Sequence, residues 1–292
     1  MRSSSSTIPL PCIMGPTGAG KTASALALAD RFPLAVINTD SRQVYRDFPL
    51  ITAQPSPEER ARCPHLLYGY LPASAKLGAG QYARAAGECI LREHASGRLA
   101  LAVGGTGLYF KALVDGLADI PDIPEHISLY WQERCAQEGS IALHALLAES
   151  DPLYAAKIHP NDKQRITRAL EVQQATGKSF SQWHAQSMSD SPFKACKIGI
   201  GLPLDELTPL LAKRIDLMLA EGAIDEARAA LQKEPDPTAP GWSGIGCAEI
   251  FQYLSGTLSL EECKSLWLKN TRAYAKRQLT WFRADPEIVW FS

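Results

Sequence analysis

The chain has 292 residues, and its shares of hydrophobic residues (46%) and charged residues (21%) are typical of a globular protein with one large core or two modest ones. Its formal net charge of −1 excludes a global positive field, so any nucleic-acid partner has to be bound through local basic patches. Seven widely spaced cysteines without a C-x-x-C pair argue against a disulfide framework or a structural zinc site, and they favour a reducing cytoplasm. No segment approaches the ~20 apolar residues of a membrane span, and we expect neither a signal peptide nor a membrane partner.

Apolar runs broken by glycine predict alternating strands and helices in the first third of the chain. Strands are expected at 10–14, 34–38 and 98–105, and helices at 21–32 and 81–96. The strands read as continuous apolar runs, which is typical of parallel strands buried on both faces.

The remaining two thirds of the chain divide into a helical stretch and a second mixed segment. Residues 116–190 contain no convincing strand and are predicted to form an inserted, all-helical subdomain. Residues 191–292 return to the mixed pattern, with strands expected at 197–202 and 287–291 and helices near 205–221, 224–233, 245–254 and 259–283. We therefore predict an α/β fold, in which residues 1–115 and 191–292 form a P-loop NTPase-like parallel sheet with helices on both faces.

Residues 15–22, GPTGAGKT, match the phosphate-loop pattern G-x-x-x-x-G-K-[ST] between a predicted strand and a predicted helix. The glycines let the backbone N–H groups face an anion, and the helix adds the positive end of its dipole. Lys21 supplies a positive charge, and the hydroxyl of Thr22 can bind Mg²⁺. The alternative is a glycine-rich turn with an accidental Lys-Thr pair, which the strand–loop–helix context disfavours. The predicted diphosphate- or nucleotide-binding residues are Gly15, Pro16, Thr17, Gly18, Ala19, Gly20, Lys21 and Thr22.

The loop alone does not name a reaction, because it is shared by many ATP-binding proteins and fits any diphosphate. Polar residues also follow the next two predicted strands, with Asp40 after the first and Thr106 after the second. Gly104 and Gly105, just before Thr106, are expected to permit close approach to the backbone. Open α/β sheets bind ligands at the carboxyl ends of their strands, so these residues are candidates for the same site. An isolated Asp after a strand is more often a cap or turn residue. Here two strands end in polar stretches beside a phosphate loop, which favours a functional role for Asp40.

Five segments together resemble the tRNA dimethylallyltransferases of the bacterial type, also called tRNA isopentenyltransferases or the IPP transferase family. They are GPTGAGKT (15–22), DSRQVYR (40–46), GGTGLYFKAL (104–113), IHPNDKQRITRALEV (158–172) and TRAYAKRQLTWFR (271–283). The first segment occurs in many NTPases, whereas the second and fourth together are much more specific. The resemblance covers nearly the whole chain in order.

The resemblance implies transfer of a dimethylallyl group from dimethylallyl diphosphate to N6 of adenosine 37, beside the anticodon of tRNA, with release of diphosphate. Asp40 is then expected to accept the proton of the N6 amine, while Lys21 and Mg²⁺ on Thr22 stabilise the leaving diphosphate. Thr17 is expected near the diphosphate or the base, and Arg214 matches the family arginine that reaches the diphosphate. A solvated helix arginine is the alternative for Arg214.

A flipped adenosine requires contacts that hold the anticodon loop. Two basic patches, 157–168 and 264–283, suit this role, although the second could also be a solvated helix with an aromatic core face. Within it, Trp281 and Phe282 are expected in the core. The predicted tRNA-binding residues are Asp40, Ser41, Arg42, Gln43, Thr106, Gln164, Arg165, Ile166, Thr167, Arg168, Ser243, Gly244, Ile245, Gly246 and Arg277.

One segment departs from the family pattern. Cys247 and Ala248 replace the usual aromatic and basic residues after Gly246, which leaves the stacking and phosphate contacts there open, and we expect Cys247 to serve packing. Three alternatives remain: an adenylate isopentenyltransferase acting on AMP, ADP or ATP, a P-loop nucleotide kinase, and a non-catalytic P-loop protein that binds RNA. The enzyme is expected to be a cytoplasmic monomer.

Overall fold

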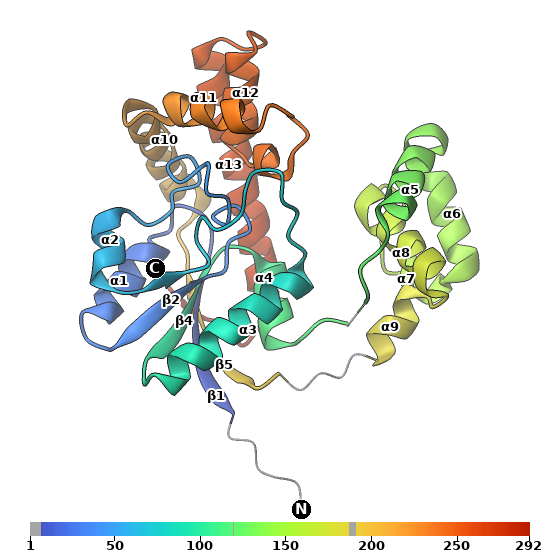
Figure 1. Ribbon diagram of the computed structural model, residues 1–292, viewed down its shortest axis with the longest axis horizontal. Helices are drawn as coiled ribbons and strands as arrows, with labels where there is room; N and C mark the ends of the chain where they lie inside the picture. The colour runs from blue at the N-terminus through green and yellow to red at the C-terminus, as the bar shows by residue number, and fades with distance from the viewer. Residues whose placement is uncertain (1–6, 119, 187–190) are drawn as a thin grey trace, which may run out of the picture. The chain divides into compact units, whose positions relative to one another are not determined.

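A computed structural model describes residues 7–118, 120–186 and 191–292 (Figure 1). The chain forms two compact units, one made of Met1–Val114 with Ser191–Ser292 and the other of Asp115–Asp190. The boundaries differ by one residue from those expected for the inserted subdomain.

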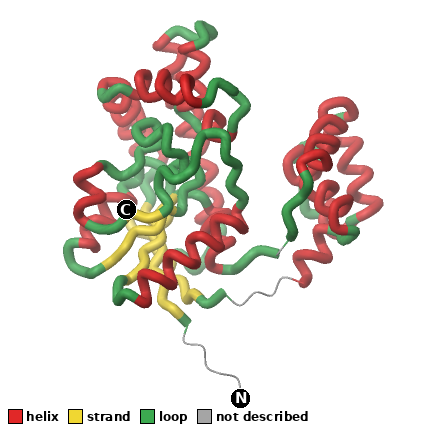
Figure 2. The backbone as a smooth tube through the Cα atoms, in the orientation of Figure 1, coloured by secondary structure: helices red, strands yellow, loops and turns green. Residues whose placement is uncertain are grey.

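The first unit contains a six-stranded sheet, drawn in yellow in Figure 2, and every pair of strands in it is parallel. The strand order is β3-β2-β4-β1-β5-β6. The strands are β1 (Ile8–Met14), β2 (Leu34–Asn38), β3 (His65–Leu66), β4 (Leu99–Gly104), β5 (Phe193–Ile200) and β6 (Val289–Phe291). The predicted parallel α/β fold is confirmed. Because β1 lies between β4 and β5, the loop that follows it leaves from the middle of the carboxyl edge.

Successive residues of the central strands pack on opposite faces of the sheet, as the pleat requires. Cys12 and Met14 contact a cluster with α3 (Ala79–Ala95) and α4 (Gly107–Val114), whereas Ile13 contacts α1 (Lys21–Ala29) on the other face. This double coverage explains why the strands read as uninterrupted apolar runs.

Three elements in the part of this unit before residue 115 were not predicted from the sequence: α2 (Pro57–Arg62), β3 and α4. Strand β3 has only two residues, which is too short for a periodic pattern. The glycine-rich start of α4 reads as loop. Helix α2 had a readable signal, because Ser56 and Glu59 form a reciprocal capping box and Pro57 occupies the first turn.

The helices after β5 form a second core around Phe48, Trp242 and Trp267. They agree with the predicted segments to within two residues, apart from a short 3₁₀ helix that was not expected. They are α10 (Leu204–Ala220), α11 (Ala223–Lys233), η1 (Pro240–Ser243), α12 (Cys247–Leu254) and α13 (Leu260–Arg283). Helix α13 packs along α10, and Leu207, Leu211 and Ala275 are buried between them.

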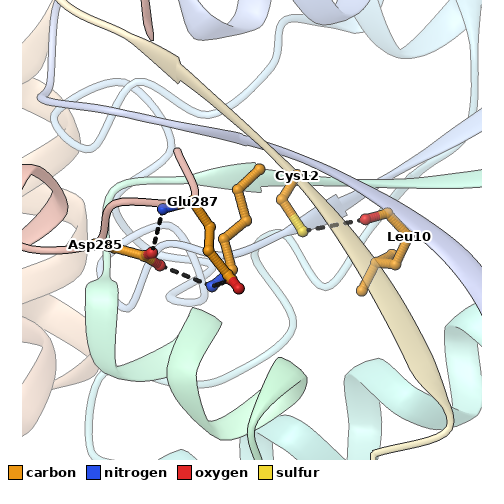
Figure 3. Close-up of polar contacts among 5 residues, drawn as sticks. Leu10, Cys12, Asp285 and Glu287 are labelled. Carbon is orange, nitrogen blue, oxygen red and sulfur yellow. Dashed lines mark hydrogen bonds and ion pairs between the residues drawn. The ribbon is translucent and has the colours of Figure 1, made fainter. Parts of the chain in front are cut away.

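An ion-pair cluster fixes the end of α13 against the sheet. The Lys197 Nζ of β5 lies 2.7 Å from Asp285 Oδ2 and 2.8 Å from Glu287 Oε2, in the turn between α13 and β6 (Figure 3). The same close-up shows the Cys12 thiol of β1 donating to the carbonyl oxygen of Leu10 at 3.4 Å. The Lys197 ion pairs therefore connect the segment after α13 to β5.

Over its described residues, 115–118 and 120–186, the second unit contains helices and no strand. Its helices are α5 (Glu125–Glu138), α6 (Ser140–Ser150), α7 (Pro152–Ala155), α8 (Lys163–Thr176) and α9 (Phe180–Gln186). They enclose a core of their own that includes Trp131, Leu143, Leu147 and Ile166. An independent core is the physical reason why this insertion reads as a separate subdomain.

Candidate active site

The loop after β1 has the conformation that its glycines predict. Gly18 and Gly20 adopt left-handed φ angles of +81° and +89°, and α1 begins directly afterwards at Lys21, as expected. The Lys21 Nζ donates to the carbonyl oxygen of Pro16 at 2.7 Å, so the side chain folds back over the loop. A Cβ on Gly15 would lie 2.0 Å from the Ile200 carbonyl oxygen, so only glycine permits this approach to β5.

Three charged side chains act on one another above the loop. Burial lowers the pKa of Lys21 to about 8, with Asp40 opposing the shift and Arg214 reinforcing it. Burial also lowers the pKa of Arg214, again opposed by Asp40. Two partly desolvated cations close to a single carboxylate form a site that favours an anionic ligand.

Asp40 is held in place through its own backbone. Asn38, which is fully buried, accepts from the Asp40 N–H at 2.9 Å and donates to the Asp40 carbonyl oxygen at 3.0 Å. Its amide also donates to the carbonyl oxygen of Leu67 at 2.9 Å, and Leu67 has an unusual φ of +64°. The sequence analysis missed Asn38, although a buried amide two residues before a candidate base is a readable signal.

The Asp40 carboxylate takes part in a turn and also faces a cavity. Its Oδ1 accepts from the Arg42 N–H at 2.8 Å, which is the loop-carboxylate role considered above. The residue nevertheless lines the cavity described below, and among the described residues no hydrogen bond to Oδ2 occurs. The turn role is therefore confirmed for Oδ1, and the role of Asp40 as a base stays a prediction.

Thr106 joins the two loops that follow β2 and β4. Its hydroxyl accepts from the Ser41 N–H at 3.0 Å, and its own N–H donates to the Thr39 carbonyl oxygen at 3.1 Å. The hydroxyl also donates to Ser41 Oγ at 3.3 Å, and the pKa of nearby Tyr274 rises to about 12 mainly through burial. A Cβ on Gly104 would lie 2.0 Å from the Thr39 carbonyl oxygen, so the predicted close approach at this glycine is to the protein's own backbone.

These residues open onto a cavity of about 340 Å³ within the first unit. It combines an apolar wall from α10 with three arginines and several hydroxyls. The lining residues are Thr17, Asp40, Ser41, Arg42, Ile51, Thr52, Leu211, Arg214, Ile215, Met218, Ser243, Ile245, Trp267, Thr271, Tyr274 and Arg277. The structure thus brings together the predicted catalytic residues Thr17, Asp40 and Arg214, with Lys21 in electrostatic contact with the last two.

Several predicted tRNA-binding residues line or border this cavity. Arg42 Nη1 donates to Ser243 Oγ at 2.9 Å and to the Pro240 carbonyl oxygen at 3.1 Å. Gln43 instead holds the protein's own backbone, because its amide donates to the carbonyl oxygens of Thr52 and Ala53 at 3.0 and 2.7 Å.

Four of the predicted tRNA contacts are corrected by burial. Ile166 and Thr167 point into the helical unit, and only Gln164, Arg165 and Arg168 of that segment are exposed. Gly244 and Gly246 are also buried, and a Cβ on Gly246 would lie 2.7 Å from both Ile51 and Trp267. A helix or turn exposes only one face, so a contiguous segment cannot offer every residue to a ligand.

Two cations of the basic segment 264–283 are paired with acidic side chains of the protein, which the sequence does not show. Lys264 pairs with Asp216 at 3.0 Å, and Arg272 approaches Asp205 at 3.8 Å. Arg277 lies over the ring of Tyr274, 5.5 Å from its centroid, at the cavity.

The two aromatic residues near the end of α13 have different environments. Phe282 is 2% exposed, as expected for a core residue, but Trp281 is 46% exposed, so its assignment to the core was wrong. Trp281 packs instead against Gly107, where a Cβ would meet the indole at 2.1 Å.

Cys247 is fully buried at the start of α12, and burial raises the pKa of its thiol. This supports the predicted packing role. Among residues 7–118, 120–186 and 191–292, no group of three or more His, Cys, Asp or Glu side chains could hold a metal ion. Within those same ranges, no helix is long and apolar enough to cross a membrane.

Family models identify the chain. The model described as IPP transferase matches residues 43–285, and the one described as isopentenyl transferase matches residues 8–65. The chain belongs to the IPP transferase family. This confirms the resemblance that the five sequence segments indicated.

The sequences of known members of this family align with most of the chain. The tRNA dimethylallyltransferase of Oleidesulfovibrio alaskensis is 62% identical over 97% of this chain and 93% of its own length. The protein of the same name from Geobacter sulfurreducens is 43% identical over 95% of this chain and 90% of its own length.

Solved structures of the IPP transferase family have the same fold. The tRNA isopentenylpyrophosphate transferase of Bacillus halodurans superimposes with a TM-score of 0.70 at 36% identity, covering 97% of this chain and 89% of its own. A eukaryotic dimethylallyltransferase, whose crystal structures are described as acting on tRNA, gives a TM-score of 0.83 at 27% identity, covering 97% of this chain and 74% of its own.

Proposed function

We propose that this protein transfers the dimethylallyl group of dimethylallyl diphosphate to N6 of adenosine 37 in tRNA and releases diphosphate. One observation carries the proposal: Asp40, Arg214 and Thr17 meet at a single cavity above a phosphate loop. The cavity is lined by three arginines and by Leu211, Ile215 and Met218 of α10, which suits a donor with a charged head and a five-carbon tail.

The leaving group is stabilised by the loop. As the bond between the allylic carbon and the bridging oxygen breaks, negative charge grows on the diphosphate. Positive charge is already present beside the loop, from the positive end of α1, Lys21 and Arg214. The site therefore does not have to reorganise while the negative charge develops.

The acceptor is activated by Asp40. The bond from N6 to the allylic carbon forms as the other bond breaks, and the N6 proton passes to the free Oδ2 of Asp40. The Asn38 contacts and the Arg42 N–H fix the carboxylate during this step. Thr106 and Tyr274 lie beside it and can orient the base.

A magnesium ion fits this donor set. Mg²⁺ takes one or two protein oxygens together with phosphate oxygens and water. Thr22, in the first turn of α1, would supply one hydroxyl, and the diphosphate would supply the rest. The ion would add positive charge at the leaving group.

We assign contacts with the tRNA anticodon stem-loop to basic and polar residues of the first unit and of the second unit. Arg42, Arg277 and Ser243 border the cavity, and Gln164, Arg165 and Arg168 are exposed on α8. We propose that these residues hold the RNA backbone while the adenosine is flipped. The enzyme is proposed to act as a monomer in the cytoplasm.

An adenylate isopentenyltransferase shares the loop and Asp40, and the family model described as isopentenyl transferase matches only that part, residues 8–65. The inserted helical unit and α13 lie outside it. They have no evident use on a free nucleotide, which favours tRNA as the acceptor.

The test is incubation with labelled dimethylallyl diphosphate and either an unmodified anticodon stem-loop or AMP, followed by mass analysis of the nucleosides. We expect label only in adenosine 37. Asp40→Asn should lower turnover by about 10²–10⁴-fold and leave stem-loop affinity unchanged.

Label in AMP alone would support the adenylate enzyme, and phosphate transfer from ATP would support a kinase. Unchanged turnover of the Asp40→Asn variant would remove this carboxylate from the mechanism. An absence of any transfer, with RNA binding retained in both proteins, would favour a non-catalytic RNA-binding protein.

A further inference from the structure

Gln278 is a buried amide that joins three distant segments of the first unit. The residue lies on α13 and is 4% exposed. Its Oε1 accepts from the Thr17 N–H of the phosphate loop at 3.0 Å, and its Nε2 donates to the carbonyl oxygen of Gly105, after β4, at 2.8 Å. Both the oxygen and the nitrogen of the amide are therefore hydrogen-bonded, the first to the phosphate loop and the second to the residue after β4.

The neighbourhood of Gln278 is shaped around this amide. A Cβ on Gly105 would lie 2.1 Å from Gln278 Nε2 and 3.2 Å from the Gly15 carbonyl oxygen. Any side chain at position 105 would therefore push the amide away from the loop. The close approach that was predicted for Gly105 is thus to a glutamine of the protein.

The bond at Thr17 has a consequence for the phosphate loop. Loops of this type bind anions through backbone N–H groups, but the Thr17 N–H is already satisfied by Gln278. Thr17 lines the cavity. The bond from Gln278 therefore fixes both the peptide plane between Pro16 and Thr17 and the direction of the Thr17 side chain. Closer to α1, the Ala19 N–H donates to the Pro16 carbonyl oxygen at 3.4 Å, which leaves the N–H groups of Gly18 and Gly20 for the ligand.

Gln278 lies on α13, which also contributes residues to the lining of the cavity. Tyr274 and Arg277 precede it by four residues and one residue, and both line the cavity. The Lys197 ion pairs anchor the turn that follows α13, which limits movement of the helix along its axis. A rigid helix can hold a loop through one side chain.

We propose that Gln278 is a positioning residue for diphosphate binding, through which α13 holds the phosphate loop in its ligand-binding shape. This inference rests on the proposed function, because it assumes that the loop binds the diphosphate of the donor. Gln278 itself touches neither substrate, and it acts through the Thr17 peptide and the Gly105 carbonyl.

The test measures binding of inorganic pyrophosphate with Mg²⁺ by calorimetry, well below the unfolding temperature. Gln278→Met keeps the length of the side chain and removes both hydrogen bonds. We expect its dissociation constant for pyrophosphate to rise about tenfold, because a lost buried hydrogen bond leaves the Thr17 N–H without a partner. Affinity for the anticodon stem-loop should stay within about twofold, since α13 remains folded.

Arg98→Ala is the matched control for general destabilisation. It removes the 2.6 Å pair between Arg98 and the buried Glu93, at the opposite end of β4 from Gly105. It should lower the unfolding temperature and leave pyrophosphate affinity unchanged. Equal losses of affinity in both variants would assign the effect to stability and overturn the proposal.

Gln278→Glu supplies a second and nearly isosteric test. A protonated carboxyl can accept from Thr17 and donate to Gly105 as the amide does, whereas an ionised carboxylate cannot donate. The ratio of the variant's dissociation constant to that of the wild type should therefore be larger at about pH 8 than at about pH 6. A ratio that stays near one at both pH values would refute the proposal, even if Gln278→Met fails to fold.

The two failures are distinguishable. If the wild-type protein does not bind pyrophosphate, the diphosphate site itself is wrong. If the wild-type protein binds it and Gln278→Met binds it equally well, the site stands and the positioning role is overturned.

Discussion

Raising the pH should weaken diphosphate binding through a single side chain, Lys21. Burial lowers its pKa to about 8, below the usual 10.5. A bound diphosphate favours the protonated ammonium, so affinity is highest well below about pH 8 and falls as the pH rises through that value. The protonated fraction falls from about nine-tenths at about pH 7 to about one-tenth at about pH 9. The dissociation constant for pyrophosphate should therefore rise about tenfold over this range.

Calorimetric titration with Mg²⁺–pyrophosphate at several pH values measures this change. The ligand also titrates, so the reference is Lys21→Arg, whose guanidinium keeps its charge throughout. We expect the ratio of the two dissociation constants, wild type over variant, to rise about tenfold between about pH 7 and about pH 9. A ratio independent of pH would assign the whole effect to the ligand and refute the reasoning about Lys21.

Three further outcomes follow from the contacts described. Asn38→Ala should lower turnover by about tenfold, because it frees the backbone that holds the Asp40 carboxylate. Pyrophosphate affinity should change little, so steady-state kinetics should detect the effect and calorimetry should not. Gly246→Ala should lower the free energy of unfolding by about 2–4 kcal/mol in denaturant titrations, because it strains a φ of +94° and crowds Trp267. Arg165→Ala and Arg277→Ala should each reduce the salt dependence of stem-loop binding by about 0.7–0.9 log units per log unit of salt. Arg228→Ala, an exposed residue paired with Asp225, should leave that slope unaltered.

The phosphate loop could be predicted from the sequence because its function is local. Gly18, Gly20 and Lys21 act through backbone angles and a helix start, and all of these are determined by adjacent residues. Asp40 could be placed near the loop for a related reason. Parallel strands end at one edge of a sheet, so the residues after β1, β2 and β4 had to meet there.

Other features of the site depend on contacts between distant segments. Gln278 reaches Thr17 across 261 residues of sequence, and no local pattern marks such a bond. The exposure of Trp281 was misjudged because an aromatic residue beside Phe282 reads as core, whereas the helix turns the two side chains by about 100° relative to each other. The predicted contacts at Ile166 and Thr167 failed for the same geometric reason.

The sequence by itself determined the family, the parallel α/β fold, and the conformation of the glycine-rich loop after β1. These properties reside in short segments whose conformation depends on neighbouring residues. Tertiary structure decided which side chains share the cavity, which cations are already paired within the protein, and which face of each helix is exposed. Those properties depend on how α10 and α13 pack against the sheet, and packing is a sum over contacts that lie far apart along the chain.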